Sequence, residues 1–180
     1  MLVSKREAED IFTAINAGKT THTGLELYLR YNQMVDLEFF DRLNIWGSFS
    51  ISKNQFVEFI DDGIDHSGNQ LPGIPSNILH SGMTVSFPFH IEFELEYRRV
   101  GTQYMNDINS LKYEDYELVH TKLNYEYNHP ESNFGFNVYA KLKNVFDTKH
   151  ASMILVNAPS FGGRAPRYYY PGIPRMFFIG

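Results

Sequence analysis

Residues 90–99, HIEFELEYRR, alternate between apolar and charged side chains without a break. Ile91 and Phe93 fall on one side of an extended chain, whereas Glu92 and Glu94 fall on the other. Period two is the signature of a β-strand with one apolar face, because a helix would mix both kinds of side chain on each of its faces. A chain built mainly from such strands must cover its apolar faces with a second sheet, with helices or with lipid.

The same alternation recurs along the chain and predicts an all-β protein. The predicted strands are residues 22–34, 43–59, 78–87, 90–99, 116–127, 134–146 and 174–180. The charged and irregular residues 1–21 are expected to form a loop. Residues 5–15 are the nearest candidate for an amphipathic helix, and they are too short to cover such a sheet.

The connections between these strands alternate in length. Long polar loops are expected at residues 61–77, 101–115 and 147–173, and short turns near Phe40, Pro88 and Pro130. Strands of about 10 residues with turns at one end and long loops at the other are typical of an outer-membrane β-barrel. We therefore predict an antiparallel transmembrane β-barrel segment of about seven consecutive meander strands with its apolar faces on lipid. A soluble all-β ligand-binding module is the alternative, because period two does not tell which face is wet.

In a membrane barrel the polar face lines the interior. The residues expected to face this lumen are Glu26, Arg30, Glu92, Glu94, Glu96, Arg98, His120 and Lys122. Tyrosines near strand ends, including Tyr97 and Tyr116, suit the aromatic girdles of such barrels. Bulky inward charges would crowd a narrow ring of strands. We therefore expect an open sheet, with unpaired edges at the strands that contain Leu25 and Phe177.

Composition excludes several function classes. The net charge is −5, which gives no basic signature for nucleic acid. Cysteine is absent, so thiol catalysis and Cys-ligated zinc are excluded. The chain has no Gly-x-Ser-x-Gly elbow, and none of its seven histidines falls in a metal-ligand or nucleophile motif. We expect no enzyme activity, no metal and no cofactor.

Two groups of loop residues could bind a ligand. Asp61, Asp62, Asp65 and His66 offer hard donors, but their spacing matches no recognised calcium loop and favours a solvated acidic loop. The best candidates for substrate binding combine arginine forks with tyrosine rings and hydroxyls. They are Arg164, Arg167, Tyr168, Tyr169 and Tyr170, for which girdle tyrosines and solvated arginines are the alternative interpretation.

Four short motifs add a resemblance to a known family. They are NAGKTTHTGLEL, GNQLPGIPSN, LKNVFDTKHA and RYYYPGIPRMFF. In order and approximate spacing, across nearly all of residues 16–180, they resemble the C-terminal part of TonB-dependent outer-membrane receptors. Within the third motif, Asn144 and Asp147 are expected to play a structural role at a strand end.

The resemblance implies a plugged barrel of the roughly 22-stranded class. It would lie in the outer membrane of a Gram-negative type of cell, in contact with lipid, and import a ferric siderophore or a similar scarce iron chelate. Energy would come from the TonB complex through an N-terminal part. The family's plug, TonB box and signal peptide have no counterpart in these residues. We therefore expect residues 1–180 to be a partial barrel domain, a fragment of a transporter.

Overall fold

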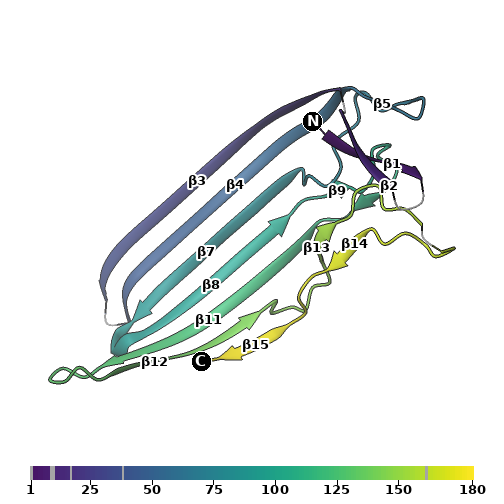
Figure 1. The fold of residues 1–180 in the computed structure, drawn as a ribbon. Coiled ribbons are helices and arrows are strands. Elements are labelled where there is room, and N and C mark those ends of the chain that lie inside the picture. Colours follow the sequence, from purple (N-terminus) through teal and green to yellow (C-terminus); the bar gives the residue numbers. More distant parts are fainter. Residues whose placement is uncertain (1, 9–10, 17, 38, 161) are drawn as a thin grey trace.

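Seven strands form one antiparallel sheet in the computed structural model, which describes residues 2–8, 11–16, 18–37, 39–160 and 162–180 (Figure 1). They are β3 (Lys19–Leu37), β4 (Phe40–Glu58), β7 (Asn77–Phe87), β8 (Ile91–Val100), β11 (Tyr116–Asn128), β12 (Gly135–Lys143) and β15 (Met176–Ile179). The order β15-β12-β11-β8-β7-β4-β3 makes each strand a neighbour of the next one along the chain. β3 and β15 are the two edges and do not pair with each other, which confirms the predicted open meander.

The remaining strands are short and pair locally. They are β1 (Leu2–Ala8) with β2 (Ile11–Asn16), β5 (Ile60–Asp61) with β6 (Ile64–Asp65), β9 (Gln103–Tyr104) with β10 (Lys112–Tyr113), and β13 (Ala151–Ile154) with β14 (Tyr169–Pro171). The predicted loop at residues 1–21 is therefore wrong. It contains the β1–β2 hairpin, and β3 already begins at Lys19. The sequence did not predict this hairpin, because residues 2–16 do not alternate regularly between apolar and polar side chains.

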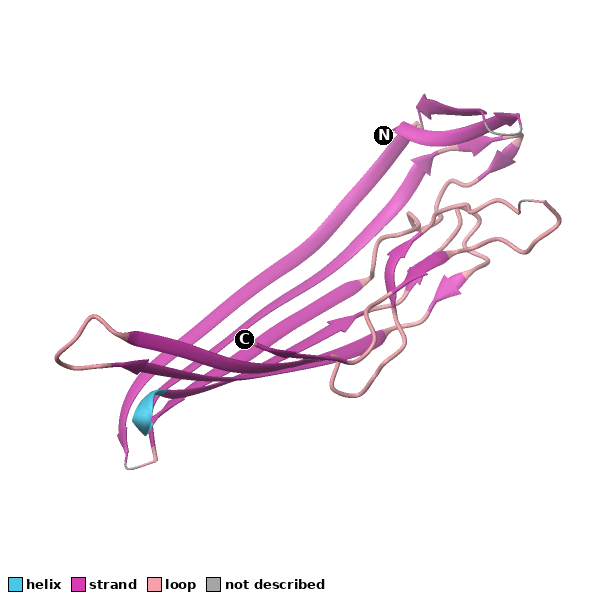
Figure 2. Cartoon of the chain, turned by 60° about the horizontal axis from the view of Figure 1, so that its bottom comes forward, coloured by secondary structure: helices cyan, strands magenta, loops and turns pink. Residues whose placement is uncertain are grey.

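Long loops and short turns lie at opposite ends of the sheet. The segments that carry β5–β6, β9–β10 and β13–β14 gather at one end, called here the loop end (Figure 1). The β3–β4 turn, the β12 hairpin and the 3-10 turn η1 (Pro88–His90) lie at the other, the turn end (Figure 2). No helix among the described residues has the length and hydropathy needed to cross a membrane.

One side of the seven-stranded sheet, called the apolar face, is not covered by any of the residues that the structure describes. Strand register places on it Leu25, Leu27, Leu29, Ile45, Phe49, Ile51, Met83, Val85, Phe93, Leu95, Leu123, Tyr125, Phe136, Val138, Phe177 and Ile179. Leu25 and Leu29 are each 64% exposed. Figure 2 shows the strands as a single curved layer. Phe56, Phe59 and Leu71 form a cluster of buried hydrophobic residues at the loop end. Phe56 lies near the end of β4, and the other two belong to the loop that follows it.

Candidate functional site

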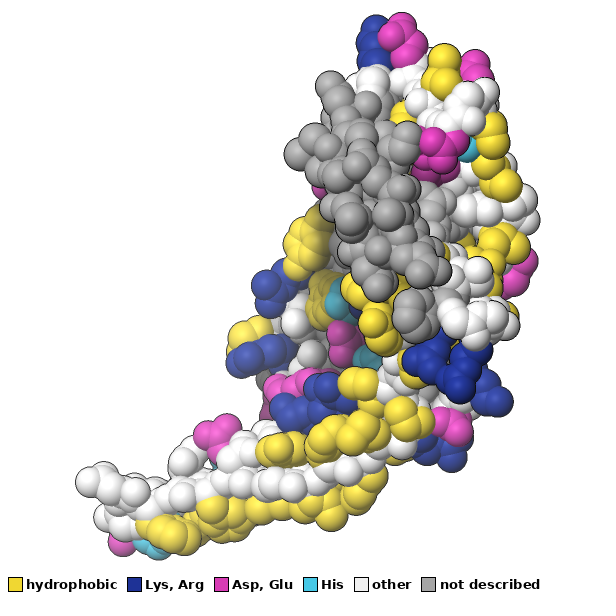
Figure 3. Space-filling view, turned by 45° about the vertical axis from the view of Figure 1, so that its right-hand side comes forward, with side chains coloured by type: hydrophobic (Ala, Val, Ile, Leu, Met, Phe, Trp, Pro, Cys, Tyr) yellow, Lys and Arg dark blue, Asp and Glu magenta, His cyan; other side chains and the backbone are white. Residues whose placement is uncertain are grey.

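The opposite side of the sheet, called the charged face, carries all eight residues predicted to face a lumen. In the register, His80 is opposite Arg98, Glu96 is opposite His120, and Glu94 is opposite Lys122. Glu26 and Arg30 of β3 share this face, because their partners on β4 continue the same rows through β7 to β8. Figure 3 shows acidic and basic side chains in the hollow of the molecule and hydrophobic side chains along its lower outer margin.

The three glutamates of β8 each accept a hydrogen bond from a side chain on a neighbouring strand. Lys122 Nζ donates to Glu94 Oε1 at a distance of 3.0 Å, and Ser86 Oγ donates to Glu92 Oε2 at 3.3 Å. The Nε2 of His80 lies 2.7 Å from Glu96 Oε1. Carboxylates two residues apart on one face would otherwise repel one another, so donors from β7 and β11 stabilise this row.

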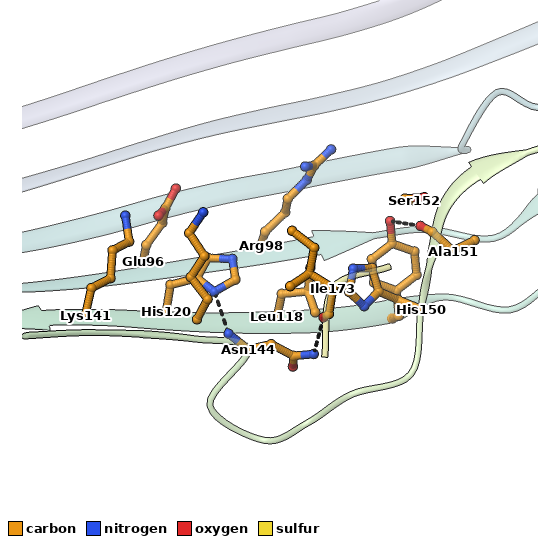
Figure 4. Close-up of a pocket in the computed structure, with 12 residues that line it drawn as sticks. Glu96, Arg98, Leu118, His120, Lys141, Asn144, His150, Ala151, Ser152 and Ile173 are labelled. Atoms are coloured by element: carbon orange, nitrogen blue, oxygen red, sulfur yellow. Dashed lines mark hydrogen bonds between the residues drawn. The ribbon is translucent and has the colours of Figure 1, made fainter. Parts of the chain in front are cut away.

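A pocket of about 400 Å³ lies on the charged face where β8, β11 and β12 approach the loop end. Arg98, Lys141 and Lys143 line it, and Glu96 is the one carboxylate among its lining residues. Glu96, Arg98 and Lys141 project from the sheet on the same side (Figure 4). Three basic side chains against one carboxylate make this pocket a site suited to anions.

The far wall of the pocket is built from the base of the loop between β12 and β15. Asn144, only 2% exposed, donates through Nδ2 to the carbonyls of Thr148 and Ile173, both at 3.0 Å. Its Oδ1 accepts from the Thr148 N–H at 2.9 Å, and its own N–H donates to His120 Nδ1 at 2.8 Å. Asn144 therefore ties both ends of the loop to β11 (Figure 4). Its φ of +51° is a left-handed conformation that asparagine tolerates better than most residues.

The structure corrects the prediction that Tyr116 belongs to the aromatic girdle. Tyr116 pairs with Val100 and lies on the charged face, where its hydroxyl donates to the Ala151 carbonyl at 3.3 Å. Its ring lies 5.2 Å from that of His150, which also lines the pocket. Counting in twos from His120 along YELVH would have placed Tyr116 on this face. His150 gave no signal, because it follows the strand in an irregular segment.

The five predicted substrate-binding residues do not join this pocket. Arg164 and Arg167 line a different recess at the loop end. Tyr169 packs its ring 5.2 Å from Tyr113, and the Tyr168 carbonyl accepts from the Leu155 N–H at 2.8 Å. Tyr170 pairs with Met153 between β13 and β14. Of the five predicted residues, the two arginines therefore line one recess, whereas the three tyrosines make contacts within the loop.

Asparagine and aspartate side chains hold the three long loops together. Asp107 and Asn157 bond reciprocally: the Asp107 N–H donates to Asn157 Oδ1 at 3.1 Å, and Asn157 Nδ2 donates to Asp107 Oδ2 at 2.5 Å. Asn109 bonds both the N–H and the carbonyl of Gln70. Burial raises the pKa of the Asp107 carboxyl above its ordinary value, and the hydrogen bond from Asn157 opposes that shift.

His, Asp and Glu side chains of the described residues form no group of three that could hold a metal ion. The acidic loop around Asp61 and Asp65 is part of a short hairpin, in which Asp65 Oδ1 accepts from the Ser67 N–H at 2.9 Å. A hydrogen bond from the Ser67 hydroxyl, together with this one from the Ser67 backbone, lowers the pKa of Asp65. Carboxylates engaged in local turn bonds are typical of a structural loop.

Comparison with known proteins agrees with this architecture. The family described as TonB dependent receptor-like, beta-barrel matches residues 2–145. The ferric yersiniabactin uptake receptor FyuA from Yersinia pestis is similar over 93% of this chain, with 18% identity and a TM-score of 0.67. BauA, the ferric preacinetobactin receptor from Acinetobacter baumannii, is similar over 99%, with 14% identity and a TM-score of 0.70.

The chain therefore belongs to the TonB-dependent receptor-like β-barrel family. It spans 24% of the length of FyuA and 25% of that of BauA. The open sheet agrees with a part of a larger barrel, because both edges present unpaired backbone groups to a next strand. Both solved proteins are receptors for ferric complexes, and their likeness to this chain lies in the fold.

Proposed function

We propose that this chain forms part of the wall of an outer-membrane TonB-dependent transporter, with its apolar face on lipid and its charged face toward the lumen. An uncovered apolar face on a single-layered sheet supports the lipid contact. The parent barrel would be a transporter without catalytic activity, driven by the TonB complex through an N-terminal part. Membership of the receptor family supports this assignment.

The cargo that we propose is an anionic iron chelate of the ferric siderophore type. The observation that carries this proposal is the pocket lined by Arg98, Lys141 and Lys143 with a single carboxylate. Such a cluster attracts negative charge through the low-dielectric walls of a barrel, and a neutral chelate would gain little from it. The ferric cargo of FyuA and BauA supports the choice of an iron complex.

The test compares an anionic with a neutral chelate in cells that lack other receptors for iron chelates. Binding of an iron-55-labelled trianionic ferric tris-catecholate and of a neutral ferric tris-hydroxamate is measured for the wild type and for Lys141→Gln/Lys143→Gln. The double variant should bind the anionic complex about tenfold more weakly, since two charge-assisted contacts are lost. Lys53→Gln, which removes a lysine outside the pocket, is the matched control. Unchanged binding of the anionic complex by the double variant would contradict the proposal.

A further inference from the structure

The segment between β13 and β14 encloses a second cavity, of about 610 Å³, that is chemically unlike the pocket on the charged face. Its lining residues are Ile154, Leu155, Val156, Ala158, Pro159, Arg164, Ala165 and Arg167. Apart from the two arginines these side chains are apolar, and none of the described residues that line the cavity carries a carboxylate. We call it the arginine recess.

Neither arginine is neutralised by a carboxylate of the described residues. In the part of the chain that the structure describes, no ion pair involves Arg164 or Arg167. By contrast, Arg99 on β8 pairs with Asp115 at 2.8 Å. Two guanidinium groups over an apolar surface offer planar hydrogen-bond donors where a carboxylate or phosphate can bind while its apolar part is buried.

One wall of the recess is fixed in place by contacts to the rest of the loop end. The Leu155 N–H donates to the Tyr168 carbonyl at 2.8 Å, which continues the β13–β14 ladder into the recess. The next residues are tied to the β9–β10 loop, because the Asn157 N–H donates to the Met105 carbonyl at 3.0 Å and its side chain bonds Asp107. A wall that is already ordered costs less conformational entropy when a ligand binds.

The geometry points to a binding site in the arginine recess for a ligand that joins an apolar chain or ring to one carboxylate or phosphate group. The cavity volume falls within the range of small-molecule pockets. A polyanion would leave most of its charge over apolar side chains, and a neutral hydrocarbon would leave both guanidinium groups without a partner. This site lies outside the proposed cargo pocket and does not depend on the nature of the cargo.

The experiment uses photolabelling in outer-membrane preparations of cells that produce the protein. The probes are an eight-carbon carboxylate with a diazirine, its primary amide, and an anionic phospholipid with the same diazirine in an acyl chain. After irradiation, mass spectrometry maps the labelled peptides. We expect the carboxylate or the phospholipid to label residues 154–167, and the amide to label them about tenfold less. Labelling by the carboxylate identifies a soluble ligand as the source, and labelling by the phospholipid identifies a membrane lipid.

Variants separate charge recognition from the fold of the loop. Arg164→Gln/Arg167→Gln should lower anionic labelling of this segment about tenfold, whereas Lys149→Gln, in the same loop but outside the recess, should leave it unchanged. Asn157→Ala removes the anchor of the wall without touching a ligand, and we expect it to weaken labelling too. Absence of labelling at residues 154–167 in the wild type would overturn the proposal. The proposal would also be overturned if the amide labelled this segment as strongly as the carboxylate, or if the double arginine variant were labelled as strongly as the wild type.

Discussion

Asp107 is a buried carboxyl group, 7% exposed, that joins the β9–β10 loop to the segment carrying the arginine recess. Because burial disfavours the charged form, its pKa in the folded protein lies above the ordinary 3.8. The folded state therefore binds a proton more readily than the unfolded state between 3.8 and the raised pKa. Within that window the stability of the loop end falls as pH rises, and above it the cost of burying the charge is constant.

We predict that Asp107→Asn makes the loop end more stable at neutral pH. The amide keeps an oxygen that can accept from Asn157 Nδ2, and it carries no charge to bury. The gain should shrink as pH falls toward the ordinary pKa, because Asp107 is then protonated in the wild type as well. Hydrogen exchange of residues 105–111, corrected for intrinsic rates, measures this between about pH 4 and about pH 8. Lower protection in the variant at neutral pH would mean that the charge-assisted bond outweighs the burial cost.

Single residues could be assigned from the sequence only where a strand fixed their side. Glu94 and Lys122 were placed on one face by counting in twos, and the structure pairs them at 3.0 Å. A structural role for Asn144 was also predicted, and in the structure it makes four hydrogen bonds to His120, Thr148 and Ile173. His150 and the apolar walls around Arg164 and Arg167 could not be predicted. Loop conformation depends on bonds between segments far apart in the sequence, such as Asp107 and Asn157, which are 50 residues apart.

At the scale of elements, β4 and β7 pack together through a large residue on one strand and a small residue opposite it on the other. Trp46 is opposite Gly82, and its ring makes an edge contact with His80 at 4.7 Å between centroids. A Cβ added at Gly82 would lie 2.6 Å from the indole Cε2 and Cζ2 atoms, which is far inside van der Waals contact. The indole thus occupies the space above the glycine, and the strand pair needs both residue types in register.

We predict that Gly82→Ala destabilises the sheet by about 1–3 kcal/mol, because the indole must move out of a packed position. In a Trp46→Ala background the same change should cost much less, since the obstructing ring is absent. Denaturant unfolding followed by circular dichroism compares the four variants of this cycle. Ser81→Ala, on the other face of β7, should have little effect. An equal cost of Gly82→Ala in both backgrounds would show that the backbone, not Trp46, requires the glycine.

The strands of the seven-stranded sheet, each with one apolar side, were the predictable part of the fold. All seven main strands were recognised, because the apolar face imposes period two on each of them. The β1–β2 hairpin was missed and the start of β3 was placed at His22 instead of Lys19. The hairpin and the first residues of β3 lie at the loop end, beyond the apolar face. Backbone hydrogen bonds still pair the strands there, but the sequence no longer alternates between apolar and polar residues.

At the scale of the whole molecule, the two free edges and the two faces of the sheet decide whether the chain suits a membrane or an aqueous environment. In hydrocarbon, each unpaired N–H and C=O along β3 and β15 would cost several kcal/mol. A membrane setting therefore requires further strands beside both edges, as in a complete barrel. A soluble setting would instead require a cover for the apolar face, and the described residues provide none over Leu25 to Leu29.

The membrane setting predicts which end of the sheet faces which side. Long loops of outer-membrane barrels lie outside the cell and short turns lie in the periplasm, so the loop end should be extracellular. Because these 180 residues contain no cysteine, a single introduced thiol is the one cysteine among them that a maleimide can modify. Ser160→Cys at the loop end should react with a membrane-impermeant maleimide on intact cells. Glu131→Cys, in the turn between β11 and β12, should react only after the outer membrane is permeabilised. Leu27→Cys on the apolar face should stay unlabelled in both conditions, because lipid excludes the reagent.

Labelling of Glu131→Cys but not Ser160→Cys on intact cells would reverse the orientation. Labelling of Leu27→Cys without permeabilisation would show that the apolar face does not contact lipid, and the membrane setting would then be wrong.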